Sequence, residues 1–353
     1  MIKKKEIQIV FYFFIMSVLL YSCSTEEQNE VPVSFSFNEN LIVKEGQEVE
    51  ISIEINSSQI NSLDLLINNK KINTWKSPSS SFKYKMNTKG MPLGTRYFSL
   101  KATMKTQEIY EDKRAITVFS SSSPLLKKLE IIREYPHNDS NYTQGLEFYK
   151  NELYESTGDP GSKGKSMVAK IDMQTGKTIK KTTLGIPYFG EGITILNDTL
   201  YQLTWKDQEC IVYGVNDFKN IRTMTYAGEG WGICNDGENL ITSDGSHKIF
   251  FRNPINFEII KTIEVCTDKN VIHSLNELEY IDGDIYANVY NQNVIVVINA
   301  LTGGVKAILD ANQVTRKGKG TGEVLNGIAY NKQDKKLYLT GKFWSSLFEV
   351  EIN

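Results

Sequence analysis

The sequence predicts an all-β chain in which a five-bladed β-propeller follows a small immunoglobulin-like β-sandwich. Three observations support this fold class. Residues 31–119 alternate apolar and polar side chains, as half-buried strands do. Residues 120–124 are rich in serine and end in proline, which is typical of a linker. Residues 125–353 carry five copies of one motif about 45 residues apart, with no helical pattern between them, which is typical of a propeller.

Residues 1–22 are predicted to be a lipoprotein signal peptide. A lysine run precedes the 14-residue apolar stretch from Ile7 to Leu20, which is too short to span a bilayer comfortably. Leu20-Tyr21-Ser22-Cys23 resembles a bacterial lipoprotein cleavage site, so we expect Cys23 to be lipidated and residues 23–30 to form a polar tether. This interpretation predicts a lipid-anchored protein of the cell envelope, periplasmic or surface-facing, that touches the membrane through its lipid only. The alternatives are an ordinary secretory signal cut nearby and an uncleaved anchor.

Residues 31–119 are predicted to form six or seven short strands. Alternation is clear from Val49 to Ile55 and from Phe82 to Met86, and turn signals such as Gly46 and Asn68-Asn69 separate the apolar runs. No catalytic pattern stands out in this segment. We therefore expect it to be a spacer domain, joined by the linker to a second domain.

The five repeats of residues 125–353 each begin at a small or polar anchor residue. The anchors are Gly145, Gly192, Gly232, Glu277 and Gly327, at separations of 47, 40, 45 and 50 residues. Further strand-like segments joined by tight turns follow each anchor, but the last repeat has only three. Lys127 to Arg133 is strand-like, and we expect it to supply the missing outer strand and close the ring. The polar residues that head the repeats would then lie around one central axis.

Composition excludes several classes of function. The chain has 40 basic and 42 acidic residues, a balance that gives no support to a nucleic-acid partner. The three histidines lack the spacing of zinc ligands. Three cysteines remain after Cys23, without a CxxC pair, so at most one disulfide is open to Cys210, Cys234 and Cys266, and all three fit buried small hydrophobic positions equally well.

Seven short motifs in the repeats combine carboxyl, amide, lysine and aromatic side chains. They are Tyr142–Gly145, Phe189–Gly192, Gln202–Lys206, Glu229–Gly232, Leu275–Tyr280, Tyr286–Tyr290 and Thr340–Trp344. In order and spacing they resemble the glutaminyl-peptide cyclotransferases of the plant and bacterial type. The resemblance covers Leu125 to Asn353. It does not extend to the N-terminal domain or to the zinc-dependent animal cyclases, which have another fold.

The resemblance implies that an N-terminal glutamine of a peptide or protein is converted to pyroglutamate with release of ammonia. It implies three catalytic residues. Glu191 would carry the proton from the attacking α-amine to the departing ammonia. Asn276 would donate to the oxyanion or hold the substrate backbone, and Lys342 would polarise the amide carbonyl or hold Glu191 by charge.

The resemblance also implies a substrate pocket in which Gln144 orients the substrate. Phe189, Trp205 and Trp231 would form aromatic walls, although packing inside a blade would explain each of them too. Tyr290 stands where the family commonly has tryptophan, which leaves the substrate preference and the rate open. The chemistry requires no cofactor, and the resemblance allows a structural divalent cation on the propeller axis.

Two other functions compete with the enzyme. One is a non-catalytic propeller that binds peptide N-termini or glycans on the cell envelope, although binding alone would not need Glu191, Asn276 and Lys342 together. The other is a quinone-dependent dehydrogenase, for which the chain lacks a repeating tryptophan docking motif and an evident calcium site. Natural substrates and oligomeric state are not predicted.

Overall fold

The computed structural model describes residues 31–37 and 40–353. The predicted signal peptide 1–22, the lipidation site Cys23 and the tether 23–30 lie outside the described residues. Across the described ranges, no helix combines the length and the apolar character that crossing a membrane requires.

The described chain is all-β apart from one short helix, as predicted. Its N-terminal part consists of two sheets. The first has the order β1 (Val33–Phe35), β3 (Glu48–Ile55), β6 (Phe82–Asn87); the second has the order β2 (Leu41–Lys44), β8 (Ile109–Phe119), β7 (Gly94–Met104), β4 (Ile60–Ile67), β5 (Lys70–Lys76). Eight strands are thus present where six or seven were expected. The prediction fell short partly because β2 spans only four residues, too few for alternation to show.

The two N-terminal sheets enclose one core. Alternate residues of β3 are buried, and Ile51 and Ile53 are each only 1% exposed. They belong to the same cluster as Leu63, Leu65 and Phe98 of the second sheet. The period-two pattern in the sequence therefore corresponds to one apolar face per strand.

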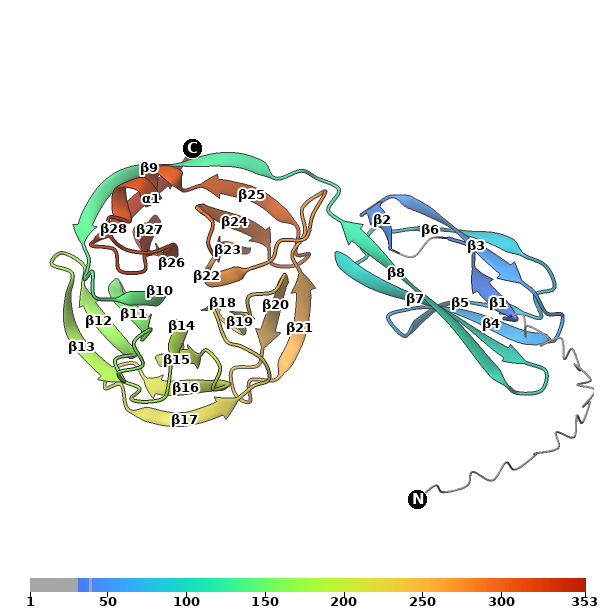
Figure 1. Cartoon of the computed structure of the whole chain (residues 1–353), viewed down its shortest axis with the longest axis horizontal. Coiled ribbons are helices and arrows are strands. Elements are labelled where there is room, and N and C mark those ends of the chain that lie inside the picture. The colour runs from blue at the N-terminus through green and yellow to red at the C-terminus, as the bar shows by residue number, and fades with distance from the viewer. Residues whose placement is uncertain (1–30, 38–39) are drawn as a thin grey trace, which may run out of the picture.

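The C-terminal part is a ring of four-stranded antiparallel units (Figure 1). The first unit consists of β10 (Tyr142–Tyr149), β11 (Glu152–Gly158), β12 (Met167–Asp172) and β13 (Lys177–Thr183). The second consists of β14 (Gly190–Leu196), β15 (Thr199–Thr204), β16 (Glu209–Gly214) and β17 (Asn220–Thr225). The third consists of β18 (Ile233–Asn235), β19 (Leu240–Ser243), β20 (Lys248–Arg252) and β21 (Ile259–Glu264). The next is β22 (Leu275–Ile281) to β25 (Val305–Asp310) with β23 (Asp284–Val289) and β24 (Val294–Asn299). The last combines β26 (Leu325–Asn331), β27 (Lys336–Gly341) and β28 (Ser346–Ile352) with β9 (Leu125–Pro136). In each unit the first strand lies toward the centre (Figure 1).

Strand β9 closes the ring. Its second half pairs antiparallel with β28, from Leu129 opposite Ile352 to Pro136 opposite Ser346. The predicted outer strand is therefore confirmed. The first four residues of β9 also pair in parallel with β25 of the neighbouring unit, which the sequence did not predict. One long strand thus covers the edges of two units and ties the first residues of the ring to the last.

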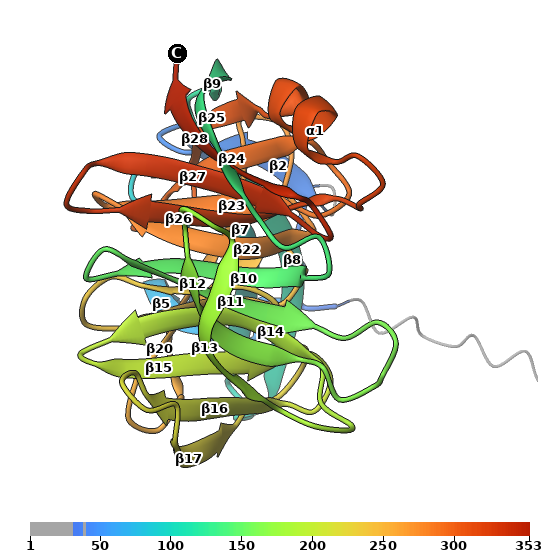
Figure 2. The ribbon, with the colours of Figure 1, turned by 90° about the vertical axis from the view of Figure 1, so that its left-hand side faces the viewer.

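Helix α1 (Asn312–Gly318) interrupts the strand pattern between β25 and β26 and was not expected. It packs against β9, β27 and β28 at the periphery of the ring (Figure 2). Val314 is fully buried, and a Cβ on Gly318 would overlap the ring of Trp344. The helix was missed because it is short and has no side-chain cap at its start, so the sequence carries no helix-start signal.

The inner strands approach one another so closely at the axis that two anchor positions require glycine. A Cβ on Gly192 would lie 2.7 Å from the backbone nitrogen of Ile233, and one on Gly232 would overlap the carbonyl of Asn276. The fourth anchor, Glu277, has a side chain where these two anchors have none. Its carboxylate accepts hydrogen bonds from the backbone N–H of Leu146 at 3.2 Å and of Ile328 at 2.8 Å, and so connects three inner strands.

The two parts of the chain touch through more than the linker. Glu264 at the end of β21 pairs with Arg96 of β7 at 3.2 Å and accepts the backbone N–H of Thr95 at 2.9 Å. Asp268 accepts the hydroxyl of Ser123 at 2.7 Å. Cys266, although it belongs to the ring, is packed into the core of the N-terminal sheets. The linker residues therefore lie beside a partly buried interface.

A chain that begins at Ser123 should remain folded and as active as the longer chain, because β9 and all later strands stay intact. Its thermal midpoint should fall by about 2–8 °C, because losing Arg96 and exposing Cys266 removes on the order of 1–2 kcal/mol. Thermal unfolding and ammonia release, measured on both chains, check this. Aggregation, or loss of most activity, would instead show that the N-terminal sheets complete the site.

Candidate active site

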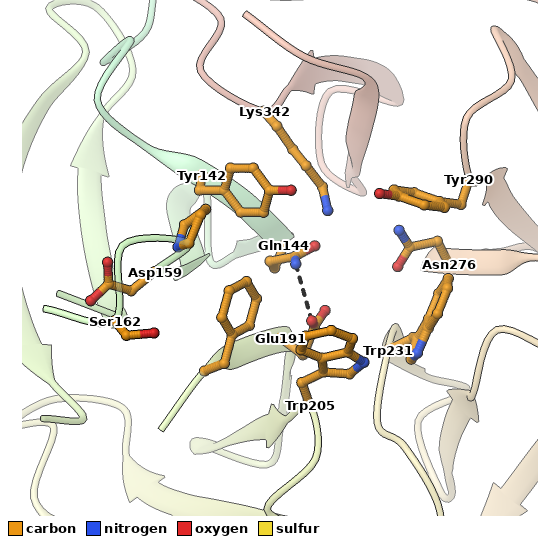
Figure 3. A pocket seen from close by; sticks show the side chains of 12 residues that line it. Tyr142, Gln144, Asp159, Ser162, Glu191, Trp205, Trp231, Asn276, Tyr290 and Lys342 are labelled. Atoms are coloured by element: carbon orange, nitrogen blue, oxygen red, sulfur yellow. Dashed lines mark hydrogen bonds between the residues drawn. The ribbon is translucent and has the colours of Figure 1, made fainter. Parts of the chain in front are cut away.

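One cavity of about 330 Å³ contains every catalytic and substrate-binding residue predicted from the sequence (Figure 3). Those residues are Gln144, Phe189, Glu191, Trp205, Trp231, Asn276, Tyr290 and Lys342. The cavity is also lined by Tyr142, Asp159, Pro160 and Ser162. Four units of the ring supply seven of these residues, and the fifth supplies Lys342 directly after β27. Positions up to 198 residues apart in sequence therefore meet here only because the ring closes.

Irregular strand pairing places the key polar side chains. The register of β10 with β11 shifts between Thr143 and Gly145, which leaves Gln144 without a partner. Similar shifts leave Glu191 unpaired in β14 and Asn276 unpaired in β22. A bulge of this kind turns a side chain away from the regular alternation, and bulges often occur beside active sites. The same local irregularity therefore directs each of the three side chains into the cavity.

Glu191 and Gln144 are joined by a buried hydrogen bond. Gln144 Nε2 donates to Glu191 Oε1 at 3.0 Å, drawn as the dashed line in Figure 3. The other end of the Gln144 amide is held by Asn326, whose Nδ2 donates to Gln144 Oε1 at 3.1 Å and to the carbonyl of Thr143 at 3.0 Å. Because Asn326 supplies a donor to Oε1, the NH₂ group of Gln144 must face Glu191. Asn326 thus orients Gln144, and Gln144 orients the carboxyl group.

Burial raises the pKa of Glu191 well above the usual range of a glutamate. The positive charge of Lys342 opposes this rise, and the negative charge of Glu229 adds to it. A carboxyl group whose pKa is raised in this way is suited to accept a proton and return it near neutral pH.

Lys342 is also buried, and burial lowers the pKa of its ammonium group to about 8, although Glu191 and Glu323 act in the opposite direction. Its Nζ lies 4.5 Å from the ring centroid of Tyr142 and 5.3 Å from that of Tyr290. Two aromatic faces therefore stabilise the cation in place of water. Tyr290, the departure from the family's usual tryptophan, still offers Lys342 an aromatic face.

Glu229 positions the two tryptophans. Its Oε2 accepts the indole N–H of Trp205 at 2.7 Å and that of Trp231 at 3.0 Å. Each indole is further packed edge-on against a second ring, Trp205 against Phe189 and Trp231 against Tyr290, both with ring centroids 5.6 Å apart. The walls of the cavity are thus aromatic and fixed in orientation.

Asn276 is 2% exposed and retains unused hydrogen-bonding capacity. Its Oδ1 is buried and makes no hydrogen bond with the part of the chain that the structure describes. An unpaired buried acceptor costs about 1–3 kcal/mol, so its retention beside the cavity favours a role in holding a donor of the substrate. Both roles expected for Asn276, donation to the oxyanion and holding of the substrate backbone, stay predictions.

Sequence reasoning missed several residues of the site. Tyr142, Glu229 and Asn326 lie within or beside motifs that were recognised, but no pattern distinguished them from structural residues. Asp159, Pro160 and Ser162 belong to the loop between β11 and β12, which carries no motif. Their role depends on proximity to Tyr142, which only the fold establishes.

Among residues 31–37 and 40–353 there is no group of three or more His, Cys, Asp or Glu side chains that could hold a metal ion. Acidic residues of the inner strand β22 are already occupied: Glu277 accepts two backbone N–H groups, and Glu279 accepts that of Tyr330 at 2.9 Å. The structural divalent cation that the resemblance allows on the axis stays a prediction. Two of the histidines do meet, since the rings of His247 and His273 lie 4.9 Å apart.

The three cysteines of the described chain are all free and buried. Burial raises the pKa of each thiol. Cys210, Cys234 and Cys266 are thus small hydrophobic residues of the interior, one of the two possibilities that the sequence left open.

Comparison with known proteins agrees with this site. The family described as glutamine cyclotransferase matches residues 100–352, so the likeness begins in β7 rather than at Leu125, and the expectation that it stops short of the N-terminal domain was too narrow. A glutaminyl-peptide cyclotransferase of Arabidopsis thaliana is 31% identical over 233 residues, which are 64% of this chain and 72% of that protein. The crystal structure of Myxococcus xanthus glutaminyl cyclase superposes with a TM-score of 0.62 and 33% identity, covering 65% of this chain and 98% of the other. The chain belongs to the glutamine cyclotransferase family.

Proposed function

We propose that this glutamine cyclotransferase converts the N-terminal glutamine of peptides or proteins to pyroglutamate, with Glu191 as the proton shuttle. The observation that carries the proposal is the buried pair of Gln144 and Glu191 in an aromatic cavity that also holds Lys342. The family and the relatives named above support the reaction.

The reaction forms one bond and breaks one. The neutral α-amine attacks the side-chain carbonyl carbon of the same glutamine, which closes a five-membered ring and places a negative charge on the oxygen. Glu191 takes the proton that the amine loses and delivers it to the departing nitrogen, which leaves as ammonia. The carboxyl group ends in the protonation state in which it began, so no other proton carrier is needed.

Lys342 and Asn276 stabilise the reacting groups in this proposal. The ammonium of Lys342 faces the negative charge that develops on the oxygen. Because Lys342 is buried away from water, this attraction is stronger than it would be in solvent. Asn276 Oδ1 accepts an N–H group of the substrate main chain. Phe189, Trp205 and Trp231 enclose the apolar stem, and Gln144 keeps Glu191 in place.

Two other carboxyl groups, those of Glu277 and Glu279, are poorly placed for the same role. Glu277 and Glu279 are fully engaged by backbone N–H groups and do not line the cavity. A non-catalytic receptor for peptide N-termini or glycans remains the competing function. It gives no reason for a buried carboxyl group of raised pKa beside a buried lysine of lowered pKa.

We also infer the finer architecture. The ring has the arrangement of a five-bladed β-propeller, with β9 as the outer strand of the last blade. The two N-terminal sheets have the arrangement of an immunoglobulin-like sandwich that acts as a spacer. Domain limits at 31–119, 120–124 and 125–353 follow from this inference.

The N-terminal segment leads to a proposal about location. A signal peptide over 1–22 that is cleaved before Cys23 would leave a lipidated protein at the cell envelope, periplasmic or surface-facing, held to the membrane by its lipid alone. Residues 23–30 would serve as the tether.

Replacing Cys23 by alanine should therefore yield a protein that is no longer acylated and no longer sediments with membranes. Mass spectrometry of the N-terminal peptide and fractionation of cell envelopes measure both effects. Acylation that persists in Cys23→Ala would exclude the lipoprotein.

The shuttle predicts opposite kinetic effects for two variants. Glu191→Gln keeps the size of the side chain but cannot accept a proton, so kcat should fall by about 10²–10⁴-fold with little change in KM. Trp205→Ala removes a wall and should chiefly raise KM. Both are measured as ammonia release from a Gln-initiated peptide, with Glu- and Asn-initiated peptides as controls. A Glu191→Gln enzyme within a few-fold of the original kcat would eliminate the shuttle.

Lys342 should shape the pH dependence. Its charge lowers the pKa of Glu191, so Lys342→Met should raise that pKa and shift the acid limb of kcat/KM to higher pH. The fall in activity that deprotonation of Lys342 causes near pH 8 should disappear at the same time. The titration of the substrate amine is common to both enzymes, so the difference between their pH profiles comes from groups of the protein alone. The exposed neighbour of the site, Lys206→Met, is the control, and an unchanged acid limb in Lys342→Met would contradict the assignment.

A further inference from the structure

A second and larger cavity, of about 520 Å³, adjoins the catalytic one. It lies over the first unit of the ring, between the segment before β10 and the loop that joins β11 to β12. Tyr142, Asp159 and Pro160 line both cavities. Figure 3 shows Asp159 beside Tyr142 at the edge of the catalytic cavity. The two cavities therefore lie side by side with these three residues between them, and we call the larger one the lysine groove.

The lysine groove is named for Lys163, Lys165 and Lys181, the three lysines among its lining residues. All three are exposed, and within the described chain none of them forms an ion pair. Asp159 is the one acidic residue among the lining residues of this cavity. Its Oδ2 is already bound by the backbone N–H groups of Lys163 at 2.5 Å and Lys165 at 2.8 Å. The groove thus presents a net positive charge, because the single negative charge of Asp159, which interacts with Lys165, offsets only part of that of the three lysines.

The same contacts make the groove a preformed surface. Asp159 is buried, and its two hydrogen bonds, together with that from the N–H of Ser162 to its carbonyl at 2.9 Å, hold the loop in a defined turn. Lys181 extends from β13, a strand paired with β12 along its whole length. A ligand would therefore lose little free energy in ordering this surface.

A peptide substrate needs such a surface. The catalytic cavity is at the small end of the range for ligand sites, so it accommodates the N-terminal glutamine and little more. The chain beyond that glutamine must leave the cavity along its wall. The lysine groove lies directly beyond Tyr142 and Asp159, which line both cavities, so a chain that leaves the catalytic cavity on this side reaches the groove.

We propose that the lysine groove binds the residues that follow the N-terminal glutamine and favours substrates with acidic side chains at these positions. This inference rests on the proposed function, because it extends the substrate site of the same reaction. The attraction between exposed charges is modest, so each lysine should contribute a factor of about 1.5 to 5 in kcat/KM. Most of the effect should appear at low ionic strength, because salt screens it.

The experiment compares three substrates: glutamine amide, which has no following residue, a Gln-Glu-Glu peptide and a Gln-Lys-Lys peptide. The enzyme variant is Lys163→Glu/Lys165→Glu/Lys181→Glu. A matched control is Lys180→Glu, an exposed lysine adjacent to Lys181 that extends from the opposite face of β13 and is absent from the groove. Ammonia release is measured for each pair at two salt concentrations.

The original enzyme should prefer the Glu peptide over the Lys peptide by about 5- to 50-fold at low salt, and the triple variant should lose or reverse this preference. Turnover of glutamine amide should stay unchanged in the triple variant, which also shows that it is folded. Lys180→Glu should keep the preference. Equal use of both peptides by the original enzyme, or a preference that survives in the triple variant, would overturn the inference. Failure of the original enzyme to turn over glutamine amide and both peptides would contradict the proposed function instead.

Discussion

The site depends on one constraint, the removal of the Glu191 carboxyl group from water. A buried carboxylate is costly, and the chain compensates only in part: Gln144 donates a single hydrogen bond, and Lys342 acts through its charge. Full compensation by a direct ion pair would leave the group permanently ionised and unable to return a proton. The aromatic walls exclude water, and Asn326 positions Gln144. Both features keep the Glu191 carboxyl group only partly stabilised as an anion.

The ring holds that state by crowding its inner strands. Gly192 and Gly232 allow adjacent strands to meet where any side chain would separate them, and Glu277 joins three strands through backbone N–H groups. The register shifts that direct Gln144 and Glu191 into the cavity are therefore supported by a framework with little room to adjust. Closure by β9 extends this restraint to the whole circle.

Charge is divided between two environments. Lys342 is buried between the rings of Tyr142 and Tyr290, where its charge lowers the pKa of Glu191. The lysines of the groove are exposed to solvent, where charge affects which peptides bind but contributes little to the chemical step. The two roles require different surroundings, and the fold provides them on either side of Tyr142.

The sequence by itself determined whatever depends on neighbours along the chain. The strand pattern and the 45-residue period are local, so the all-β class could be predicted before the structure. The motifs around Glu191 and Lys342 are local too, and their resemblance to a known family implied all eight pocket residues. Only the tertiary structure decided what depends on distant partners. Asn326 meets Gln144 across 182 residues, Arg96 meets Glu264 across 168, and the lysine groove exists only because a loop and a strand of the first unit face the cavity. Helix α1 was invisible for the same reason, because its stability comes from packing against Trp344 and not from a signal within its own seven residues.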